Sequence, residues 1–294
     1  MITKARGSWL RSEARLTARL LADNVSAALV PGLLCTAAAG VHYRVGGPGM
    51  AARLAVSAGV FLLYSYVFDA SNQARNAAED RVNKPHRPIP SGLATSHGLL
   101  RRFWAGMAVY TLVGWFAGIL PWVLLWQAVI VGLNLLSKPR HYIFVKWPAM
   151  VCGAIAQLAA AWRIGGPLDS TGWTWILVIT ITFIAALPFE DVRDMAGDRA
   201  IGRRTLALTV GPWPVRIWFA TVTAVLPVVL YLLLYRRSHA GTPVILTCSA
   251  VVAALSWTTT ARSLCRRTVP ADRITYLLFT ITYCVAVAMA LPLL

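Results

Sequence analysis

The stretch that organises this chain is residues 68–92, FDASNQARNAAEDRVNKPHRPIPSG, which follows a long apolar run. Within it, polar residues recur every three or four positions: Asp69, Asn72, Asn76, Asp80 and Asn83. A helix places side chains with this spacing on one face, so we expect a ladder of carboxylates and amides, with Glu79 on its flank. At a membrane boundary such a ladder is costly unless a cation occupies it. Magnesium with a phosphate ester fits, because Mg²⁺ binds oxygen ligands together with substrate phosphate.

The same stretch ends in a basic loop with three prolines. Its cationic residues are Arg81, Lys84, His86 and Arg87. Guanidinium and ammonium groups bind phosphate oxygens through charge-assisted hydrogen bonds. We therefore expect this loop to hold the phosphate of the same ligand.

A second stretch, residues 189–206, has the same character and reads FEDVRDMAGDRAIGRRTL. Asp191, Asp194 and Asp198 share a helix face here, and three arginines follow. Seven of the eleven acidic residues of the chain lie in the two stretches: Asp69, Glu79, Asp80, Glu190, Asp191, Asp194 and Asp198. Ordinary helix-end charges at a membrane surface are the alternative interpretation. Two matching acid-then-base stretches favour a ligand site over that alternative.

The composition indicates an all-α, polytopic membrane protein. The chain is 57% hydrophobic and only 13% charged, about half the charged fraction of a soluble domain. A bilayer admits only helices or closed barrels, and the apolar runs are continuous rather than alternating, which argues against a barrel. Nine apolar segments are long enough to cross a membrane: 25–43, 51–73, 96–118, 121–137, 143–162, 172–189, 212–235, 242–261 and 274–293. We expect one integral membrane domain, with residues 25–294 forming a nine-helix bundle around a central cavity.

Residues 1–24 precede the bundle, and their mixed leucines and arginines suit an amphipathic helix on an anionic membrane surface. With the N-terminus inside, 23 of the 28 lysines and arginines fall in inside segments, which predicts a cytoplasmic N-terminus. Both acidic stretches then end spans on the cytoplasmic side, where they face one cavity. The net charge of +17 reflects this topology signal, and no nucleic-acid-binding pattern is present in the sequence.

The five cysteines and five histidines are dispersed, which favours neither disulfides nor a histidine metal site. Aromatic residues lie one or two turns into the membrane from the acidic stretches. Tyr64, Phe68 and Phe183 are the candidates for a cavity wall that stabilises a carbocation, and Tyr66, Phe189, Tyr276 and Tyr283 extend the set. For any one of them, core packing is the simpler interpretation.

These motifs resemble those of the UbiA superfamily of intramembrane prenyltransferases. That family has a first motif NDxxDxxxD followed by RxNKPxRPxxSG. Here the ends of the first part match as Asn72 and Asp80, and the continuation matches from Arg81 to Gly92. The second motif, DxxDxxxD with a trailing GRRTL, is complete from Asp191 to Leu206. The resemblance implies a nine-helix bundle that binds a prenyl diphosphate through magnesium.

The first motif departs from the family pattern at two positions. Gln73 and Asn76 stand where the family has aspartates. An amide is a weaker magnesium ligand than a carboxylate and cannot take a proton from an acceptor substrate. The form found here resembles the UbiA-type terpene cyclases, which ionise a prenyl diphosphate and cyclise the cation. An ordinary prenyltransferase acting on an aromatic or quinone-precursor acceptor is the alternative.

The resemblance assigns roles residue by residue, on a farnesyl or geranylgeranyl diphosphate substrate. The catalytic set is Asn72, Asp80, Asp191 and Asp194. The magnesium set adds further oxygen donors and comprises Asn72, Asn76, Glu79, Asp80, Asp191, Asp194 and Asp198. The diphosphate set is Arg81, Lys84, Arg87, Lys138, Lys146 and Arg204. A transporter is the non-enzymatic alternative, but it would place polar residues at mid-span rather than at one boundary.

Overall fold

The computed structural model describes the backbone of residues 2–294 and the side chains of residues 11–294. Every regular element in this part of the chain is helical, which confirms the all-α prediction. In chain order the elements are α1 Ile2–Leu21, α2 Val25–His42, α3 Gly47–Arg75, α4 Ala77–Asn83, α5 Ser96–Phe116, α6 Leu120–Ile130, η1 Val131–Leu136, η2 Pro139–His141, α7 Tyr142–Gly165, α8 Ser170–Ala186, η3 Leu187–Phe189, α9 Glu190–Ala200, α10 Leu206–Val210, α11 Pro212–Leu233, η4 Tyr235–Arg237, α12 Thr242–Cys265, α13 Val269–Ala288 and α14 Ala290–Leu293.

Seven segments within residues 2–294 are long and apolar enough to cross a membrane: Val25–His42, Gly47–Arg75, Pro139–Gly165, Ser170–Ala200, Pro212–Arg237, Thr242–Cys265 and Val269–Leu293. The two other predicted spans also form helices. One is α5, which carries Arg101 and Arg102 in its second turn. The other is the shorter apolar segment Leu120–Leu136, formed by α6 and the π-helical turn η1. Length and composition therefore support seven of the nine predicted spans.

Large apolar side chains cover much of the molecular surface. Phe116 is 85% exposed, Phe144 is 72% exposed, and Trp104, Leu112 and Ile181 are more than half exposed. Soluble proteins rarely expose apolar surface on this scale, whereas lipid tails accept it without cost. The protein is therefore an integral membrane protein.

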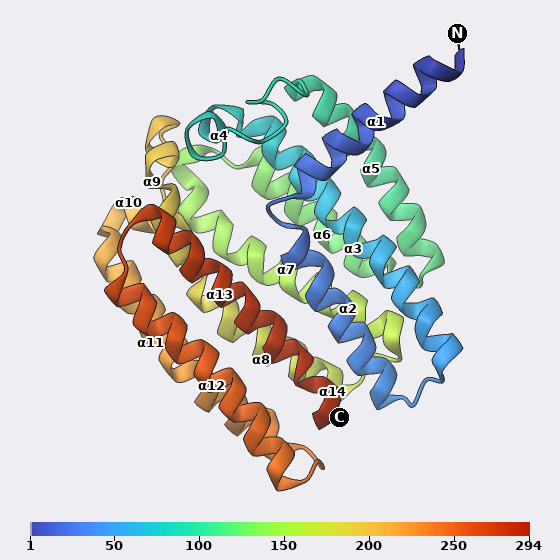
Figure 1. Cartoon of the computed structure of the whole chain (residues 1–294), viewed down its shortest axis with the longest axis vertical. Coiled ribbons are helices and arrows are strands. Elements are labelled where there is room, and N and C mark those ends of the chain that lie inside the picture. The colour runs from blue at the N-terminus through green and yellow to red at the C-terminus, as the bar shows by residue number, and fades with distance from the viewer. Residues whose placement is uncertain (1) are drawn as a thin grey trace.

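The long helices form a closed bundle (Figure 1). α2 packs against both α3 and α7, and α3 packs against α5. On the other side α11 packs against α8 and α12, and α13 closes the bundle by contacting α2. The short helices α4 and α9 lie together at one end, at the upper left in Figure 1. Both acidic stretches therefore lie at the same end of the molecule, as the sequence predicts.

Small residues allow close contact at the centre of the bundle. A side chain on Gly153 of α7 would collide with the Trp126 ring, which occupies the space beside it. Tyr64 donates a hydrogen bond to the Gly153 carbonyl at 3.1 Å, and the Trp126 indole donates to the Tyr64 carbonyl at 3.1 Å. Small residues bring membrane helices together in this way, and here they fix two aromatic rings across three helices.

The expected continuous ladder on one helix face is wrong, because the helix breaks at Asn76. α3 ends at Arg75 and α4 begins at Ala77, with Asn76 at φ −103° and ψ 22°. Asparagine is a poor helix residue, and Arg203 donates to its side-chain oxygen at 2.6 Å. The residues before and after the break consequently have different partners.

The N-terminal segment forms helix α1, which contacts α3. Leu16 and Leu20 are buried against the bundle, so this helix is partly packed on protein. The side chains of residues 1–10 lie outside the described residues. The placement of residues 1–24 on a membrane surface therefore stays a prediction.

Candidate active site

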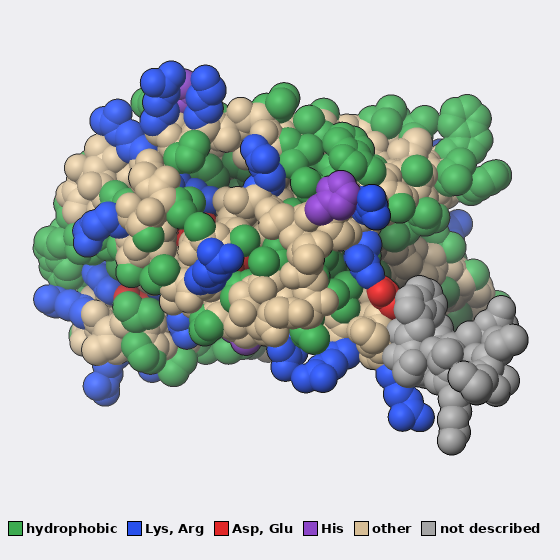
Figure 2. Space-filling view, turned by 90° about the horizontal axis from the view of Figure 1, so that it is seen from above, with side chains coloured by type: hydrophobic (Ala, Val, Ile, Leu, Met, Phe, Trp, Pro, Cys, Tyr) green, Lys and Arg blue, Asp and Glu red, His purple; other side chains and the backbone are tan. Residues whose placement is uncertain are grey.

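Two adjoining cavities open at the end where α4 and α9 meet. The polar one has a volume of about 80 Å³ and the apolar one about 220 Å³. Both are lined by Asn24, Phe68, Met150 and Glu190, so the two cavities adjoin each other. Viewed from above, basic side chains gather over this region and acidic side chains are visible in the recesses between them (Figure 2). The joined cavities offer a charged compartment next to an apolar one.

The carboxylates of α9 form one wall of the polar cavity. Asp191, Asp194 and Asp198 all line it, as predicted. Lys146 of α7 donates to Asp191 Oδ1 at 2.6 Å and to Glu190 Oε2 at 3.2 Å. The predicted Lys146 is thus a cationic group inside the site. Glu190 was not predicted as a site residue, although its position directly before Asp191 is the signal that could have found it.

Arg203 joins the two acidic stretches. Its Nη1 donates to Glu79 of α4 and, at 2.9 Å, to Asp198 of α9, while Nη2 donates to Asn76. Its guanidinium also lies 4.4 Å from the centre of the Tyr142 ring. One buried cation therefore links the two halves of the site.

The turn after α9 places the Arg203 side chain in the wall of the polar cavity. Gly202 has φ +65°, a conformation that glycine adopts without strain, and the Arg203 amide closes the turn on the Asp198 carbonyl at 2.9 Å. The next amide, that of Arg204, bonds instead to the Pro139 carbonyl. Sequence reasoning chose Arg204 for the diphosphate, but Arg203 is the residue that lines the cavity.

Asn83 fixes the distance between α4 and α9. It donates to the Asp194 carbonyl at 3.1 Å and accepts from the Gly197 amide at 3.2 Å. A side chain at Gly197 would collide with the Asn83 amide. The asparagine that precedes Lys84 and Pro85 is therefore a clamp between the two motif helices rather than a cavity ligand.

Asp80 pairs with Arg87 beneath the cavity. Arg87 Nη1 donates to Asp80 Oδ1 and its Nε donates to Asp23 Oδ2, both at 2.8 Å. Burial raises the pKa of Asp80 to about 6 even though the Arg87 charge lowers it. Burial alone would raise the pKa of Asp23 too, but Arg87 and His86 hold it below its usual value. Arg87 and Lys84 line the polar cavity, whereas Asp80 supports it from behind.

Gln73 and Asp69 point away from the polar cavity. Gln73 is 1% exposed and donates to the Leu20 carbonyl at 2.9 Å, which ties α3 to the end of α1. Asp69 is fully buried and accepts hydrogen bonds from Asn24 and Ser65. Gln73, which replaces an aspartate of the family motif, therefore makes a structural contact with Leu20.

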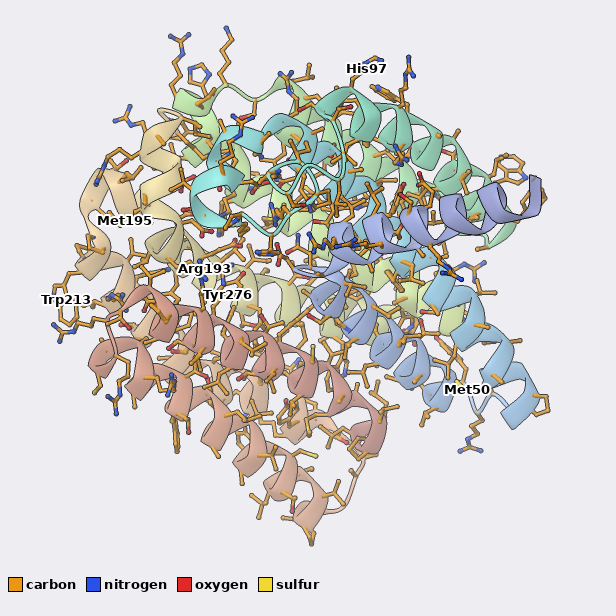
Figure 3. All side chains as sticks on the ribbon, turned by 45° about the horizontal axis from the view of Figure 1, so that its top comes forward. Met50, His97, Arg193, Met195, Trp213 and Tyr276 are labelled. Atoms are coloured by element: carbon orange, nitrogen blue, oxygen red, sulfur yellow. The ribbon has the colours of Figure 1, made fainter. Side chains whose placement is uncertain are left out.

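The remaining predicted site residues divide into those inside and those outside the cavities. Asn72 and Glu79 line the polar cavity. Arg81, Lys138 and Arg204 are exposed and do not line either cavity. Arg193, which was not predicted, lies with its guanidinium 4.4 Å from the Tyr276 ring at the same end (Figure 3).

The apolar cavity is walled by aromatic rings, including the three predicted ones. Tyr64 and Phe68 stack on Trp126 with ring centres 4.3 Å and 5.4 Å apart. Phe183 packs against Tyr283 at 5.2 Å. The aromatic residues that line the cavity are Tyr64, Phe68, Trp126, Phe183, Tyr276, Phe279 and Tyr283. Their ring faces carry negative potential that can stabilise a cation.

The donor set of the polar cavity suits magnesium chemically, since carboxylate and amide oxygens are the ligands that Mg²⁺ takes. One oxygen beside it, Asp80 Oδ2, is buried and has no hydrogen-bond partner among the described atoms. Within the described residues no three Asp, Glu, His or Cys side chains already converge as a metal cluster. Lys146 and Arg203 lie between the carboxylates instead.

The fold and the joined cavities define an intramembrane helical protein suited to an amphiphilic ligand with a charged head. A family model described as the UbiA prenyltransferase family matches residues 33–285. The chain therefore belongs to that family, which confirms the resemblance of its motifs.

Two relatives and one solved structure are similar to the chain. It is 35% identical to a somaliensene A/B synthase of Streptomyces somaliensis over 90% of this chain and 87% of that protein. It is 36% identical to the diterpene cyclase eriG of Hericium erinaceus, over half of this chain and 49% of that protein. The fold matches a UbiA homologue of Archaeoglobus fulgidus, solved bound to DMAPP and Mg²⁺, with a TM-score of 0.63 at 14% identity, over 93% of this chain and 99% of that one.

Proposed function

We propose that the protein is a magnesium-dependent terpene cyclase that ionises farnesyl or geranylgeranyl diphosphate and cyclises the resulting cation. The observation that carries this proposal is that the polar cavity adjoins the aromatic cavity, with four lining residues in common. The charged head of a prenyl diphosphate matches the first and its isoprenoid tail matches the second. The 35% identity to a terpene synthase over nearly the whole chain supports the same function.

Five residues of the polar cavity would hold the metal: Asn72, Glu79, Asp191, Asp194 and Asp198. When bound, Mg²⁺ supplies positive charge that stabilises the departing diphosphate. Asn76 and Asp80, which were also in the predicted magnesium set, hold the guanidinium groups of Arg203 and Arg87. In this proposal they position cations rather than bind the metal.

Four cationic side chains of the polar cavity bind the diphosphate oxygens: Lys84, Arg87, Lys146 and Arg203. Positive groups held in place stabilise the charge that develops on the leaving group as the carbon–oxygen bond breaks. The apolar lining of the aromatic cavity delays capture of the cation by water, so the cation has time to react with its own double bonds. Tyr64, Phe68 and Trp126 line this cavity, and their π-systems stabilise the cation.

The test uses purified protein in detergent or vesicles, with magnesium and each diphosphate in turn, and no acceptor. We expect release of diphosphate together with a cyclic hydrocarbon or alcohol, and no turnover with excess chelator. Turnover that begins only after addition of a phenol or quinone precursor would instead establish a prenyltransferase, the activity named in the family description.

We also propose that the cavity mouth faces the cytoplasm, because 23 of the 28 lysines and arginines fall in the segments predicted to lie on that side. Cys265 offers a direct test, since it is exposed at the end of α12 on the mouth side. Arg273, shortly after it, contacts the Asn83 carbonyl at 3.2 Å. A membrane-impermeant maleimide should label Cys265 in inverted vesicles. Labelling only in right-side-out vesicles would reverse the orientation.

A further inference from the structure

Asp69 of α3 is a buried carboxylate that the proposed chemistry leaves unused. It is fully buried, and it takes part in none of the ion pairs formed by residues 11–294. Among the described side chains, its two oxygens accept hydrogen bonds only from neutral groups, Asn24 Nδ2 and Ser65 Oγ. Arg87 acts on Asp69 only through its charge and does not pair with it, and a buried carboxylate without a paired cation is costly, so its presence calls for a reason.

Both partners of Asp69 line the apolar cavity. Ser65 lies one helical turn before Asp69, and this spacing lets Ser65 Oγ donate to Asp69 Oδ2 at 3.0 Å. Tyr64 and Phe68 of the same helix line this cavity with Ser65, and their rings both stack on Trp126. The serine hydroxyl therefore sits at the aromatic wall with a carboxylate directly behind it.

We propose that Ser65 and Asp69 form the proton acceptor that ends the cyclisation, an inference that rests on the proposed cyclase function. The C–H bond next to the cationic carbon breaks and its electron pair forms the alkene. The proton passes to Ser65 Oγ as the serine's own proton passes to Asp69 Oδ2. The cation becomes a neutral cyclic alkene and Asp69 becomes a carboxylic acid, which loses its proton to water after the products leave.

Two other hydroxyls of the apolar cavity are weaker candidates. Thr180 Oγ1 and Tyr283 OH are buried and have no hydrogen-bond partner among the described residues. A neutral hydroxyl without a base behind it cannot keep a proton, whereas the Ser65 hydroxyl is backed by a carboxylate. The alternative for Asp69 is a purely structural role, in which it only anchors Asn24 at the start of α2.

The experiment compares Asp69→Asn and Ser65→Ala with the wild type in two readouts, diphosphate release and the ratio of hydrocarbon to alcohol products. The side-chain oxygen that remains in Asp69→Asn can still accept the hydrogen bond from Asn24. This variant therefore removes the base and keeps the structural contact with Asn24. We expect both variants to release diphosphate within about threefold of the wild-type rate while the hydrocarbon-to-alcohol ratio falls about tenfold or more. Without the base the cation is deprotonated more slowly, so water captures more of it and the alcohol product increases.

Ser71→Ala is the matched control, because Ser71 is a buried serine of the same helix that lies outside both cavities and bonds to Asn134. It should keep the wild-type product ratio. If Asp69→Asn fails to fold, Ser65→Ala carries the test, since it leaves the carboxylate and its Asn24 contact in place.

An unchanged product ratio in both folded variants would overturn the proposal, as would a ratio that changes only in Thr180→Val or Tyr283→Phe. A wild-type product that consists wholly of an alcohol would also overturn it. Wild-type protein that releases no diphosphate without an acceptor would instead remove the proposed function, and this inference with it.

Discussion

The two acidic stretches have similar sequences, yet the structure uses them differently. The stretch in α9 presents Asp191, Asp194 and Asp198 to the polar cavity. Of the acidic and amide residues of the first stretch, Asn72 and Glu79 line it, and the loop after α4 adds the cations Lys84 and Arg87. The other acidic and amide residues of the first stretch hold the surrounding structure: Asp69, Gln73, Asn76, Asp80 and Asn83.

This difference arises from helix continuity. α9 runs unbroken from Glu190 to Ala200, so its aspartates keep a common face. The break at Asn76 gives α3 and α4 separate orientations and separate partners. The comparison indicates that α9 supplies most of the carboxylates of the polar cavity, whereas most acidic and amide residues of the first stretch hold the structure around it. The following substitutions test this division.

The largest effect is expected from Asp191→Asn. This change removes a cavity carboxylate that also holds Lys146 at 2.6 Å. Loss of one such electrostatic group lowers kcat by about 10²–10³-fold. Diphosphate release by the purified variant measures the effect. Glu13→Gln is the control, because Glu13 pairs with Arg102 away from both cavities. A loss smaller than tenfold would contradict the central role given to α9.

The second effect concerns the link between the stretches. Arg203→Gln leaves Glu79 and Asp198 buried without their cation, which should lower the free energy of unfolding by about 3 kcal/mol or more and reduce activity. Arg204→Gln alters the exposed neighbour and should change little. Thermal unfolding of the two detergent-solubilised variants checks this. Equal unfolding temperatures would show that Arg203 does not join α4 to α9.

The third effect tests whether position 73 is structural. Gln73→Asp restores the aspartate of the family motif, but it places a carboxylate against the Leu20 carbonyl. We expect a loss of about 1–3 kcal/mol in the free energy of unfolding and no change in the magnesium requirement. Asn76→Asp should be better tolerated, because Arg203 can pair with the new charge. A lower magnesium requirement in Gln73→Asp would show that this side chain reaches the metal.

The smallest effect is a pH dependence from Asp80. Its pKa rises from 3.8 to about 6 on folding, so the native state holds the proton more tightly than the unfolded state. The stability that this group contributes is complete below pH 4 and is lost as the pH rises through 6. With excess chelator present, the unfolding temperature of the wild-type protein should therefore fall more steeply between pH 4 and pH 6 than that of Asp80→Asn. Parallel pH profiles would rule out the raised pKa.

Much of this architecture follows from local sequence. The apolar runs predict the helices, and the spacing of Asp191, Asp194 and Asp198 predicts their common face on α9. The tyrosine and phenylalanine positions one or two turns into the membrane predict part of the aromatic wall, because helix geometry alone sets their depth. Trp126 has no such signal, since it lies within an apolar run far from either motif.

The partners of polar residues could not be predicted in the same way. The choice between Arg203 and Arg204 depends on the Gly202 turn and on the contact of Arg204 with Pro139, which is 65 positions earlier in the chain. The orientation of Gln73 depends on Leu20 in another helix. Contacts between distant segments decide which way these side chains point, and the spacing of a motif contains no information about them.

The end of α1 and the residues after it also form part of the mouth. The Leu20 carbonyl accepts a hydrogen bond from Gln73. The Asp23 carboxylate accepts one from Arg87 and lies 3.0 Å from His86 Nε2. The C-terminus lies at the opposite end of the bundle, beyond α14 (Figure 1). An affinity tag for purification therefore belongs at the C-terminus. A chain that began at residue 25 would lack Asp23, so Arg87 would lose one of the two carboxylates that hold it at the polar cavity.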